Sequence, residues 1–134
     1  MDFIILNISN HLSSLWSDEQ VQACKAFALP NAQARCPGIT AEAVTILDVP
    51  FPRVDPHLDK DGVELLASEC AMTYVFPRKR AIVGVHLMGE QSLCMALRRL
   101  LGCPVFVSTT ERIVKELPDG TKQSTFRFVQ MRAI

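Results

Sequence analysis

The sequence has no long hydrophobic run, because no window approaches the roughly 18 uninterrupted apolar residues of a transmembrane helix. It also lacks a basic amino-terminal region followed by an apolar stretch and a cleavage site, which is the pattern of a secretory signal. Net charge is absent as well, since 14 basic side chains balance 14 acidic ones. This balance removes the positive field that non-specific DNA-binding proteins use. We therefore expect a soluble, cytoplasmic protein that binds neither a membrane nor a long nucleic acid.

Metal-binding and redox motifs are missing too. The 5 cysteines, an odd number, include no CxxC pair, and we expect buried, reduced thiols. The 3 histidines are widely spaced and form no HxxxH pattern. Neither the GxGxxG fingerprint of dinucleotide-binding proteins nor the phosphate-binding GxxxxGK(S/T) motif occurs. The sequence therefore predicts no metal, no cofactor and no conventional nucleotide hydrolysis.

The charges are unevenly distributed along the chain. Residues 1–77 hold ten acidic and four basic side chains, a net of −6, whereas residues 78–134 hold ten basic and four acidic ones, a net of +6. Such polarity is typical of an anionic ligand held by the second half, or of charge-matched packing between two protomers. Uneven surface charge without a partner is the alternative.

The first half of the sequence predicts two strand and helix units. Residues 3–8 are an apolar, branched run typical of a strand buried on both faces. A capping box at Ser17 predicts the start of a helix, with the side chain of Gln20 reaching back to the cap. Residues 30–40 contain two prolines and a glycine and predict a loop. A second strand over residues 43–49 ends at prolines, and Asp61 begins a second predicted capping box.

The second half predicts a third unit and then a hairpin. Residues 81–88 form an apolar strand, and Gly89 turns the chain into a helix that stops at Gly102. A fourth strand covers residues 104–109, and an alternating segment begins at Arg112. An Asp-Gly turn at residues 119–120 then leads into a last strand. One domain over residues 1–134 results: an α/β sandwich with a mostly parallel sheet and a C-terminal antiparallel hairpin.

In such sheets ligands bind beyond the carboxyl ends of the strands, which selects three loops. The first loop follows the first strand and carries amide, hydroxyl and imidazole groups that can hold a phosphate or the edge of a base. Ser and Asn side chains also commonly cap helices and fill turns, and that interpretation stays open. The candidates in this loop are Asn7, Ser9, Asn10 and His11.

The second loop follows the third strand, and its backbone amides open a helix that directs positive dipoles above the sheet. The candidates are Met88, Gly89, Glu90 and Gln91. Glu90 can equally be a simple partner of the helix dipole. His86 lies two residues before the end of the strand, and we interpret it as a hydrogen-bonded histidine of the sheet and not as a catalyst.

The third loop follows the fourth strand, where three hydroxyls precede an arginine in the basic half of the chain. The planar guanidinium of arginine matches phosphate oxygens. The alternative is an ion pair of this arginine with Glu111 or Glu116. The candidates are Ser108, Thr109, Thr110 and Arg112.

Six segments together carry a resemblance to a known family: residues 6–11 (LNISNH), 16–20 (WSDEQ), 85–90 (VHLMGE), 107–116 (VSTTERIVKE), 119–122 (DGTK) and 126–132 (FRFVQMR). They resemble the small CRISPR-associated proteins of type III systems that are grouped with the ring nucleases. The resemblance implies a Rossmann-like three-layer sandwich related to the CARF sensor domains.

The resemblance also implies a function, namely metal-independent cleavage of cyclic oligoadenylate, with cyclic tetraadenylate as the expected ring, to switch off type III CRISPR signalling. A ribose 2′-hydroxyl would attack the neighbouring phosphorus. Arg112 and the helix amides near Glu90 would stabilise the developing charge, and His11 would accept the proton. The residues expected to orient the ligand are Asn7, Ser9, Asn10, Met88, Gly89, Gln91, Ser108, Thr109 and Thr110.

A cyclic tetranucleotide has rotational symmetry, so we expect a two-fold homodimer as its receptor. Two alternatives from other classes stay open, and the first of them uses the same residues. One is a module that senses or sequesters the cyclic nucleotide without cleaving it. The other is an interaction protein that uses a Rossmann-like scaffold and binds no nucleotide.

Overall fold

One mixed sheet contains all the strands of the computed structural model, which describes residues 2–134. The strands follow the order β2-β1-β3-β4-β5 across the sheet, and every neighbouring pair is parallel except the antiparallel β4 and β5. The predicted mostly parallel sheet with a C-terminal hairpin is therefore confirmed. The strands are β1 (Phe3–Ile8), β2 (Val44–Val49), β3 (Ile82–Leu87), β4 (Val105–Glu116) and β5 (Lys122–Ala133).

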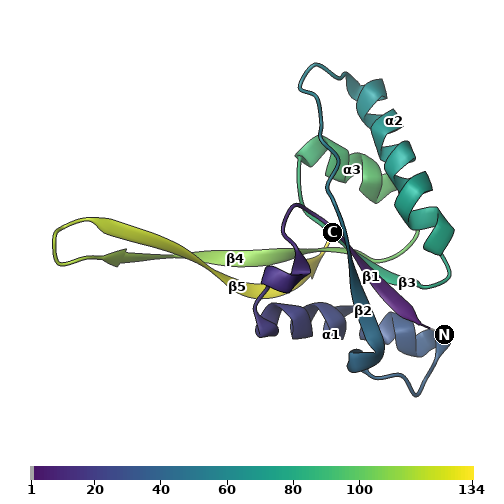
Figure 1. Ribbon diagram of the computed structural model, residues 1–134, viewed down its shortest axis with the longest axis horizontal. Coiled ribbons are helices and arrows are strands. Elements are labelled where there is room, and N and C mark those ends of the chain that lie inside the picture. The colour runs from purple at the N-terminus through teal and green to yellow at the C-terminus, as the bar shows by residue number, and fades with distance from the viewer. Residues whose placement is uncertain (1) are drawn as a thin grey trace.

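Helices cover both faces of this sheet and complete the three layers. Helix α1 (Asp18–Arg35) packs on one face, and α2 (Lys60–Cys70) and α3 (Gln91–Leu100) pack on the other (Figure 1). The predicted Rossmann-like three-layer sandwich is thus the observed architecture. Short helical turns complete the chain at Ser13–Leu15, Ala41–Ala43, Ala71–Val75 and Phe76–Arg78.

The start of α1 agrees with the sequence and its end does not. The Ser17 hydroxyl accepts a hydrogen bond from the backbone amide of Gln20 at 3.1 Å, as the capping pattern predicts. The Gln20 side chain, however, does not reach back to the cap, because it donates to Ser108 on β4. The helix also continues through Pro30 to Arg35, so the predicted loop over residues 30–40 begins six residues too early. Tertiary contact explains this extension, since the amide of Asn31 donates to the carbonyl oxygen of Val83 at 3.0 Å.

Helix α2 begins slightly earlier than its sequence pattern predicts. The cap is Asp59, whose carboxylate accepts from the backbone amide of Gly62 at 2.8 Å, and Asp61 lies inside the first turn. The predicted capping box at Asp61 is therefore wrong by two residues. Both positions present an aspartate to the helix start, so the sequence pattern cannot distinguish them.

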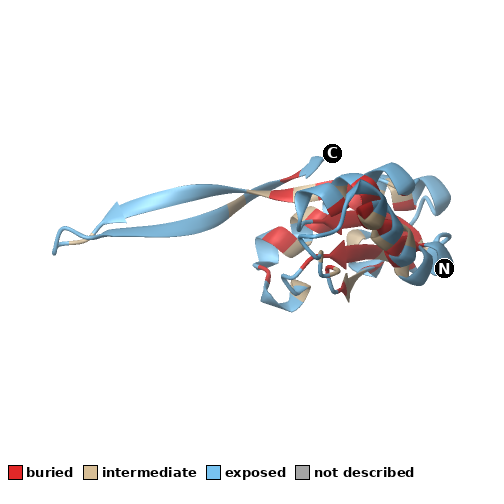
Figure 2. Cartoon of the chain, turned by 90° about the horizontal axis from the view of Figure 1, so that it is seen from above, coloured by how far each residue is buried: buried red, intermediate tan, exposed pale blue. Residues whose placement is uncertain are grey.

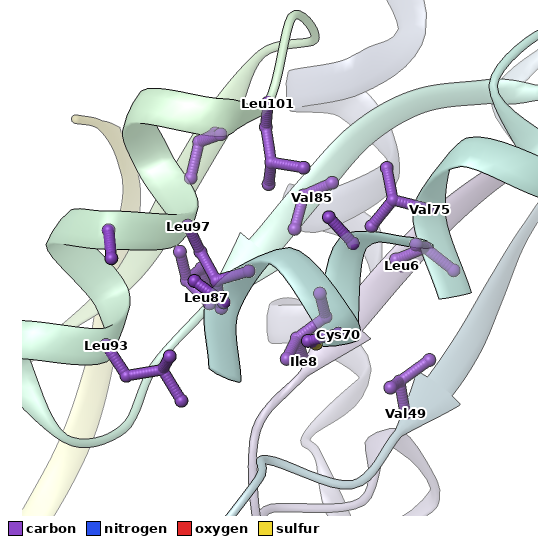
Figure 3. Close-up of a cluster of buried hydrophobic side chains, with 14 of the residues drawn as sticks. Leu6, Ile8, Val49, Cys70, Val75, Val85, Leu87, Leu93, Leu97 and Leu101 are labelled. Carbon is purple, nitrogen blue, oxygen red and sulfur yellow. The ribbon is translucent and has the colours of Figure 1, made fainter. Parts of the chain in front are cut away.

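Two apolar clusters hold the layers together. Figure 3 shows the cluster between the sheet and helices α2 and α3, where side chains from all these elements point toward one another. Full burial of each large aliphatic side chain contributes roughly 1.5–3 kcal/mol. The second cluster lies between the sheet and α1 and includes Cys24, Ala28 and Phe106. The labelled members in Figure 3 are Leu6, Ile8, Val49, Cys70, Val75, Val85, Leu87, Leu93, Leu97 and Leu101.

The hairpin of β4 and β5 extends far beyond the rest of the molecule (Figures 1 and 2). Strand β4 pairs with β3 only at Val105 and Phe106, and the hairpin beyond these residues is two strands wide. The fourth strand does not end near residue 109, as the sequence predicts, but continues to Glu116 past an irregularity in register between Thr109 and Thr110. The predicted turn is confirmed, and Gly120 there has a φ of +86°. We call residues 110–128 the arm.

Candidate functional site

A pocket of about 560 Å³ lies at the carboxyl ends of β1 and β3, against the base of the arm. This is the edge of a parallel sheet where ligands bind. Its lining combines polar groups of β3, β4, α1 and the loop after β1 with two phenyl rings of the arm. The lining residues are Ser9, Asn10, His11, Gln20, His86, Met88, Gly89, Ser108, Thr110, Phe126 and Phe128.

All three predicted loops contribute to this one pocket. The structure brings together seven of the twelve candidate residues: Ser9, Asn10, His11, Met88, Gly89, Ser108 and Thr110. The other five, which do not line the pocket, are Asn7, Glu90, Gln91, Thr109 and Arg112.

A second large pocket, of about 790 Å³, lies at the opposite edge of the sheet. Its walls include Arg35, Lys79 and Arg80, but they contain no hydroxyl, carboxamide or imidazole group that could orient a ligand. It is also at the amino ends of the strands. We therefore take the pocket at the carboxyl edge as the candidate site.

A row of hydrogen-bonded side chains crosses three strands behind this pocket. His86 of β3 lies between Asn7 of β1 and Ser108 of β4: its Nδ1 is 2.9 Å from Asn7 Oδ1, and its Nε2 is 2.7 Å from Ser108 Oγ. All three side chains are buried, with His86 only 2% exposed. Gln20 of α1 joins the row, because its amide donates to Ser108 Oγ at 3.0 Å. We call Asn7, His86 and Ser108 the polar row.

The partners of His86 determine which of its ring nitrogens carries the proton. Asn7 Oδ1 is a carbonyl oxygen and can only accept, so His86 Nδ1 must donate. A neutral imidazole has one N–H group, so Nε2 holds a lone pair and accepts the hydroxyl proton of Ser108. The Ser108 oxygen in turn accepts from Gln20. The hydrogen bonds therefore run in one direction, from Gln20 through Ser108 to His86.

His86 is neutral at ordinary pH. Burial, and to a smaller extent charge repulsion from the nearby His11, lower the pKa of the imidazole to about 4. The indole of Trp16 packs edge-on against the imidazole with ring centroids 4.8 Å apart, which keeps water from this side. The sequence-based interpretation of His86 as a hydrogen-bonded histidine of the sheet agrees with these contacts. The same side chain also borders the pocket, which that interpretation did not anticipate.

Asn7 is buried behind the pocket and its polar atoms are all engaged. Its Nδ2 donates to Asp48 Oδ1 and to the carbonyl oxygen of His11, each at 2.9 Å. Burial by itself raises the pKa of Asp48, but hydrogen bonds from Asn7 and Ser13 outweigh this effect and leave the pKa below its ordinary value. Asp48 is thus a carboxylate that fixes the orientation of Asn7. Asn7 therefore positions His86 and the first loop, and it does not face a ligand.

Glu90 is engaged in capping α3. Its carboxylate oxygens accept from the backbone amides of Ser92 at 3.0 Å and Leu93 at 2.9 Å. Hydrogen bonds from the Ser92 hydroxyl and from these two amides lower the pKa of Glu90. The helix amides that we expected to face a ligand phosphate are therefore occupied by the chain's own carboxylate. This matches the alternative interpretation of Glu90 as a partner of the helix dipole, and Gln91 beside it is an exposed residue of the first turn.

Arg112 lies outside the pocket because β4 continues where a loop was expected. Its guanidinium donates two hydrogen bonds to Ser124 Oγ, at 3.0 and 2.7 Å. The predicted alternative, an ion pair with a neighbouring glutamate, is not formed, because Glu111 pairs with Arg127 instead. Arg112 is directly opposite Phe126 in the register. Since opposite residues share a face, Arg112 lies on the pocket face of the arm, farther out.

Four residues of the pocket were not among the sequence candidates: Gln20, His86, Phe126 and Phe128. The sequence pattern places Gln20 in a capping box, and nothing in that pattern indicates that its side chain instead bonds a residue on a distant strand. The two phenylalanines alternate with polar residues in the last strand, which indicates that they share a face. Nothing local indicates that this face borders the first loop. Thr109, which was a candidate, donates its hydroxyl to the carbonyl oxygen of Gln130.

No family model, curated protein sequence or solved structure matches this chain. The fold and the pocket therefore define its class: an α/β protein with a three-layer sandwich and a polar pocket at the carboxyl edge of its sheet. Within residues 2–134, no helix is long and apolar enough to cross a membrane. The same residues contain no group of three or more histidine, cysteine or acidic side chains placed to hold a metal ion.

Proposed function

We propose that this chain is a ring nuclease, a phosphodiesterase that opens cyclic oligoadenylate without a metal ion and thereby ends type III CRISPR signalling. The observation that carries the proposal is the pocket at the carboxyl edge, where hydroxyl, amide and imidazole groups of β3, β4, α1 and the loop after β1 meet two phenyl rings of the arm. The resemblance of the loop and hairpin segments to the ring nuclease group supports the same ligand. Cyclic tetraadenylate is the expected ring.

The pocket offers each part of such a ligand a suitable surface. Adenine bases stack on exposed aromatic rings, and Phe126 is 72% exposed at the pocket wall. Hydroxyl and amide groups of Asn10 and Thr110 can bond the ribose and the base edges. Arg112 lies on the same face of the arm directly opposite Phe126, where its guanidinium can reach a phosphate of a ligand that extends out of the pocket.

The proposed reaction is an internal transfer at phosphorus. A ribose 2′-hydroxyl attacks the adjacent phosphorus in line with the bond to the 5′-oxygen, which gives a 2′,3′-cyclic phosphate and a free 5′-hydroxyl. Holding the two groups in line can lower the barrier by about 7 kcal/mol or more. Arg112 would stabilise the charge that develops on the phosphate oxygens. His11 is exposed on the pocket wall and can exchange a proton with the ligand.

A two-fold homodimer is part of the proposal, because a cyclic tetranucleotide presents equivalent groups to two protomers. The arm supports this arrangement. An isolated two-stranded ribbon is marginal in water, yet outside the pocket the arm exposes Ile113 and Val114 at 41% and 53%. A second protomer would cover these side chains. If the charge polarity of the chain drives the pairing, raising the salt concentration weakens the dimer. If the dimer interface is mainly apolar, salt leaves the stability of the dimer unchanged.

A binding module that does not cleave the ring is the second candidate. The observation that favours it is the position of Arg112, whose guanidinium is bonded to Ser124 outside the pocket. Such a module would hold the cyclic nucleotide in the same pocket as a sensor or a sequestering protein. It would use the same stacking rings and hydroxyls.

Incubation with labelled cyclic tetraadenylate in EDTA distinguishes these functions. Linear product with a 2′,3′-cyclic phosphate end supports the ring nuclease, and a stable complex without product supports the binding module. If no cyclic oligoadenylate shifts the melting temperature, both are wrong. Phe126→Ala should weaken binding about tenfold or more, because base stacking contributes roughly 1–3 kcal/mol. The matched control is Phe76→Ala, an exposed phenylalanine outside the pocket, which should bind as the wild type does.

A further inference from the structure

Ser108 is the one polar-row residue that lines the pocket and whose side-chain oxygen contacts a neutral base. Its proton is directed to His86 Nε2 at 2.7 Å, and one oxygen lone pair accepts from Gln20 at 3.0 Å. The sulfur of Met131 also lies 3.5 Å from this oxygen. A hydroxyl oxygen has two lone pairs, so one is left after the hydrogen bond from Gln20, and we assign it to a ligand in the pocket. A ligand hydroxyl that donates to it extends the chain of hydrogen bonds to His86 without any rearrangement.

The other pocket hydroxyls do not offer this path. Ser9 directs its hydroxyl toward Asn7 Oδ1 at 2.8 Å, and this acceptor is a carbonyl oxygen, a far weaker base than an imidazole. The third pocket hydroxyl, that of Thr110, is not among the hydrogen-bond partners of the His86 ring. Only Ser108 passes its proton to an imidazole lone pair. The direction of the hydrogen bonds therefore distinguishes Ser108 from its neighbours.

We propose that Ser108 and His86 form a proton relay that deprotonates the attacking 2′-hydroxyl of the ligand, with Asn7 as the positioning residue that fixes the imidazole. This inference rests on the proposed function and assigns its general base. The 2′-hydroxyl proton moves to Ser108 Oγ as the Ser108 proton moves to His86 Nε2. The 2′-oxygen then bonds to phosphorus, and the bond from phosphorus to the 5′-oxygen breaks.

Every proton in this step is accounted for without another reactant. The departing 5′-oxygen takes a proton from water or from His11 at the pocket wall, and the imidazolium of His86 returns its proton to solvent through Ser108. The charged groups around His86 are few: His11 follows β1, and the Asp48 carboxylate lies behind Asn7. The phosphate of the bound ligand adds a negative charge in the pocket, which favours the transient imidazolium.

Two variants and a control test the relay. Ser108→Ala and His86→Gln should slow single-turnover cleavage by about 100-fold or more, while the Kd for cyclic tetraadenylate changes less than about threefold. Ser108→Thr keeps the hydroxyl and should retain most of the rate. Ser68→Ala, on α2 at the other face of the sheet, should cleave at the wild-type rate. If Ser108→Ala cleaves as fast as the wild type, the relay is wrong and the ring nuclease stands. If the wild type cleaves no cyclic oligoadenylate, both the relay and the ring nuclease proposal are wrong.

Nitrogen-15 NMR of the imidazole tests the relay without any ligand. The wild type should show His86 as the neutral tautomer protonated at Nδ1, and Ser108→Ala should shift the Nε2 resonance because its hydrogen bond is lost. A tautomer protonated at Nε2 would overturn the relay whatever the activity. Circular dichroism of each variant verifies that the fold is kept. A normal spectrum together with slow cleavage excludes unfolding as the cause.

Discussion

Acid should destabilise this protein well above the pH at which its carboxylates titrate, and His86 is the reason. In the native state its pKa is about 4, because burial disfavours the charged imidazole. In the unfolded chain the pKa returns to the ordinary value of about 6.5. The unfolded chain therefore binds a proton more readily than the native one between these two values. Stability is complete above pH 6.5 and is lost as the pH falls toward 4.

The size of the effect follows from the separation of the two pKa values. Each pH unit below 6.5 lowers the free energy of unfolding by about 1.4 kcal/mol, so the loss between pH 7.5 and 5.0 is about 2 kcal/mol. Carboxylates contribute little in this window. The pKa values of Asp48 and Glu90 lie below their ordinary values, so both groups stay ionised above pH 5 in the native and unfolded states.

Urea unfolding at several pH values, followed by the fluorescence of the only tryptophan, measures this loss. Trp16 packs against His86 and is 7% exposed, so its emission reports directly on this part of the core. His86→Gln should abolish most of the pH dependence between 7.5 and 5.0. His57→Gln is the matched control, because the His57 side chain is 92% exposed, and it should keep the wild-type dependence. Equal losses in the wild type and in His86→Gln would refute the reasoning.

Two further predictions follow from packing and burial. Gly89→Ala should lower the free energy of unfolding by roughly 1–3 kcal/mol in urea, since an added Cβ would lie 2.4 Å from the ring of Phe51. Gly102→Ala, which meets no atom within 4 Å, should show no such loss, and equal losses in both variants would contradict the packing argument. Burial raises the pKa of the Cys24 thiol to about 12, so Cys24 should resist a maleimide in the native protein, whereas the exposed Cys36 should react. Mass mapping of the labelled peptides checks this, and rapid labelling of Cys24 would show that the α1 face opens.

Much of the fold could be predicted from the sequence, because most of its signals are local. Apolar runs of branched residues indicate the strands, and the Asp-Gly pair indicates the hairpin turn, with Gly120 in the left-handed region. The extension of α1 through Pro30 could not be predicted. It depends on a hydrogen bond from Asn31 to Val83, which are 52 residues apart. At such positions tertiary contacts override the low intrinsic helix propensity of proline.

The place of the candidate site could also be predicted, but not the roles of its residues. The carboxyl-edge rule brings all three loops to one pocket, whereas Arg112 lies on the arm because β4 does not end at Thr109. The contact of Gln20 with Ser108 joins residues 88 positions apart, and no pattern near either residue indicates it. Hydrogen-bond direction across strands exists only in the folded chain. The sequence can therefore propose polar residues for a site without showing which of them are already engaged.

The arm links the shape of the pocket to the position of the distant hairpin tip. The seven residues from Thr110 to Glu116 span about 23 Å at roughly 3.3 Å per residue. A tilt of about 10° at the base would thus move the tip by about 4 Å. Phe126 and Phe128 are at once part of this lever and part of the pocket wall. A partner that binds the tip and tilts the arm therefore alters affinity in the pocket, and by thermodynamic reciprocity a molecule in the pocket then alters the affinity of the tip for that partner.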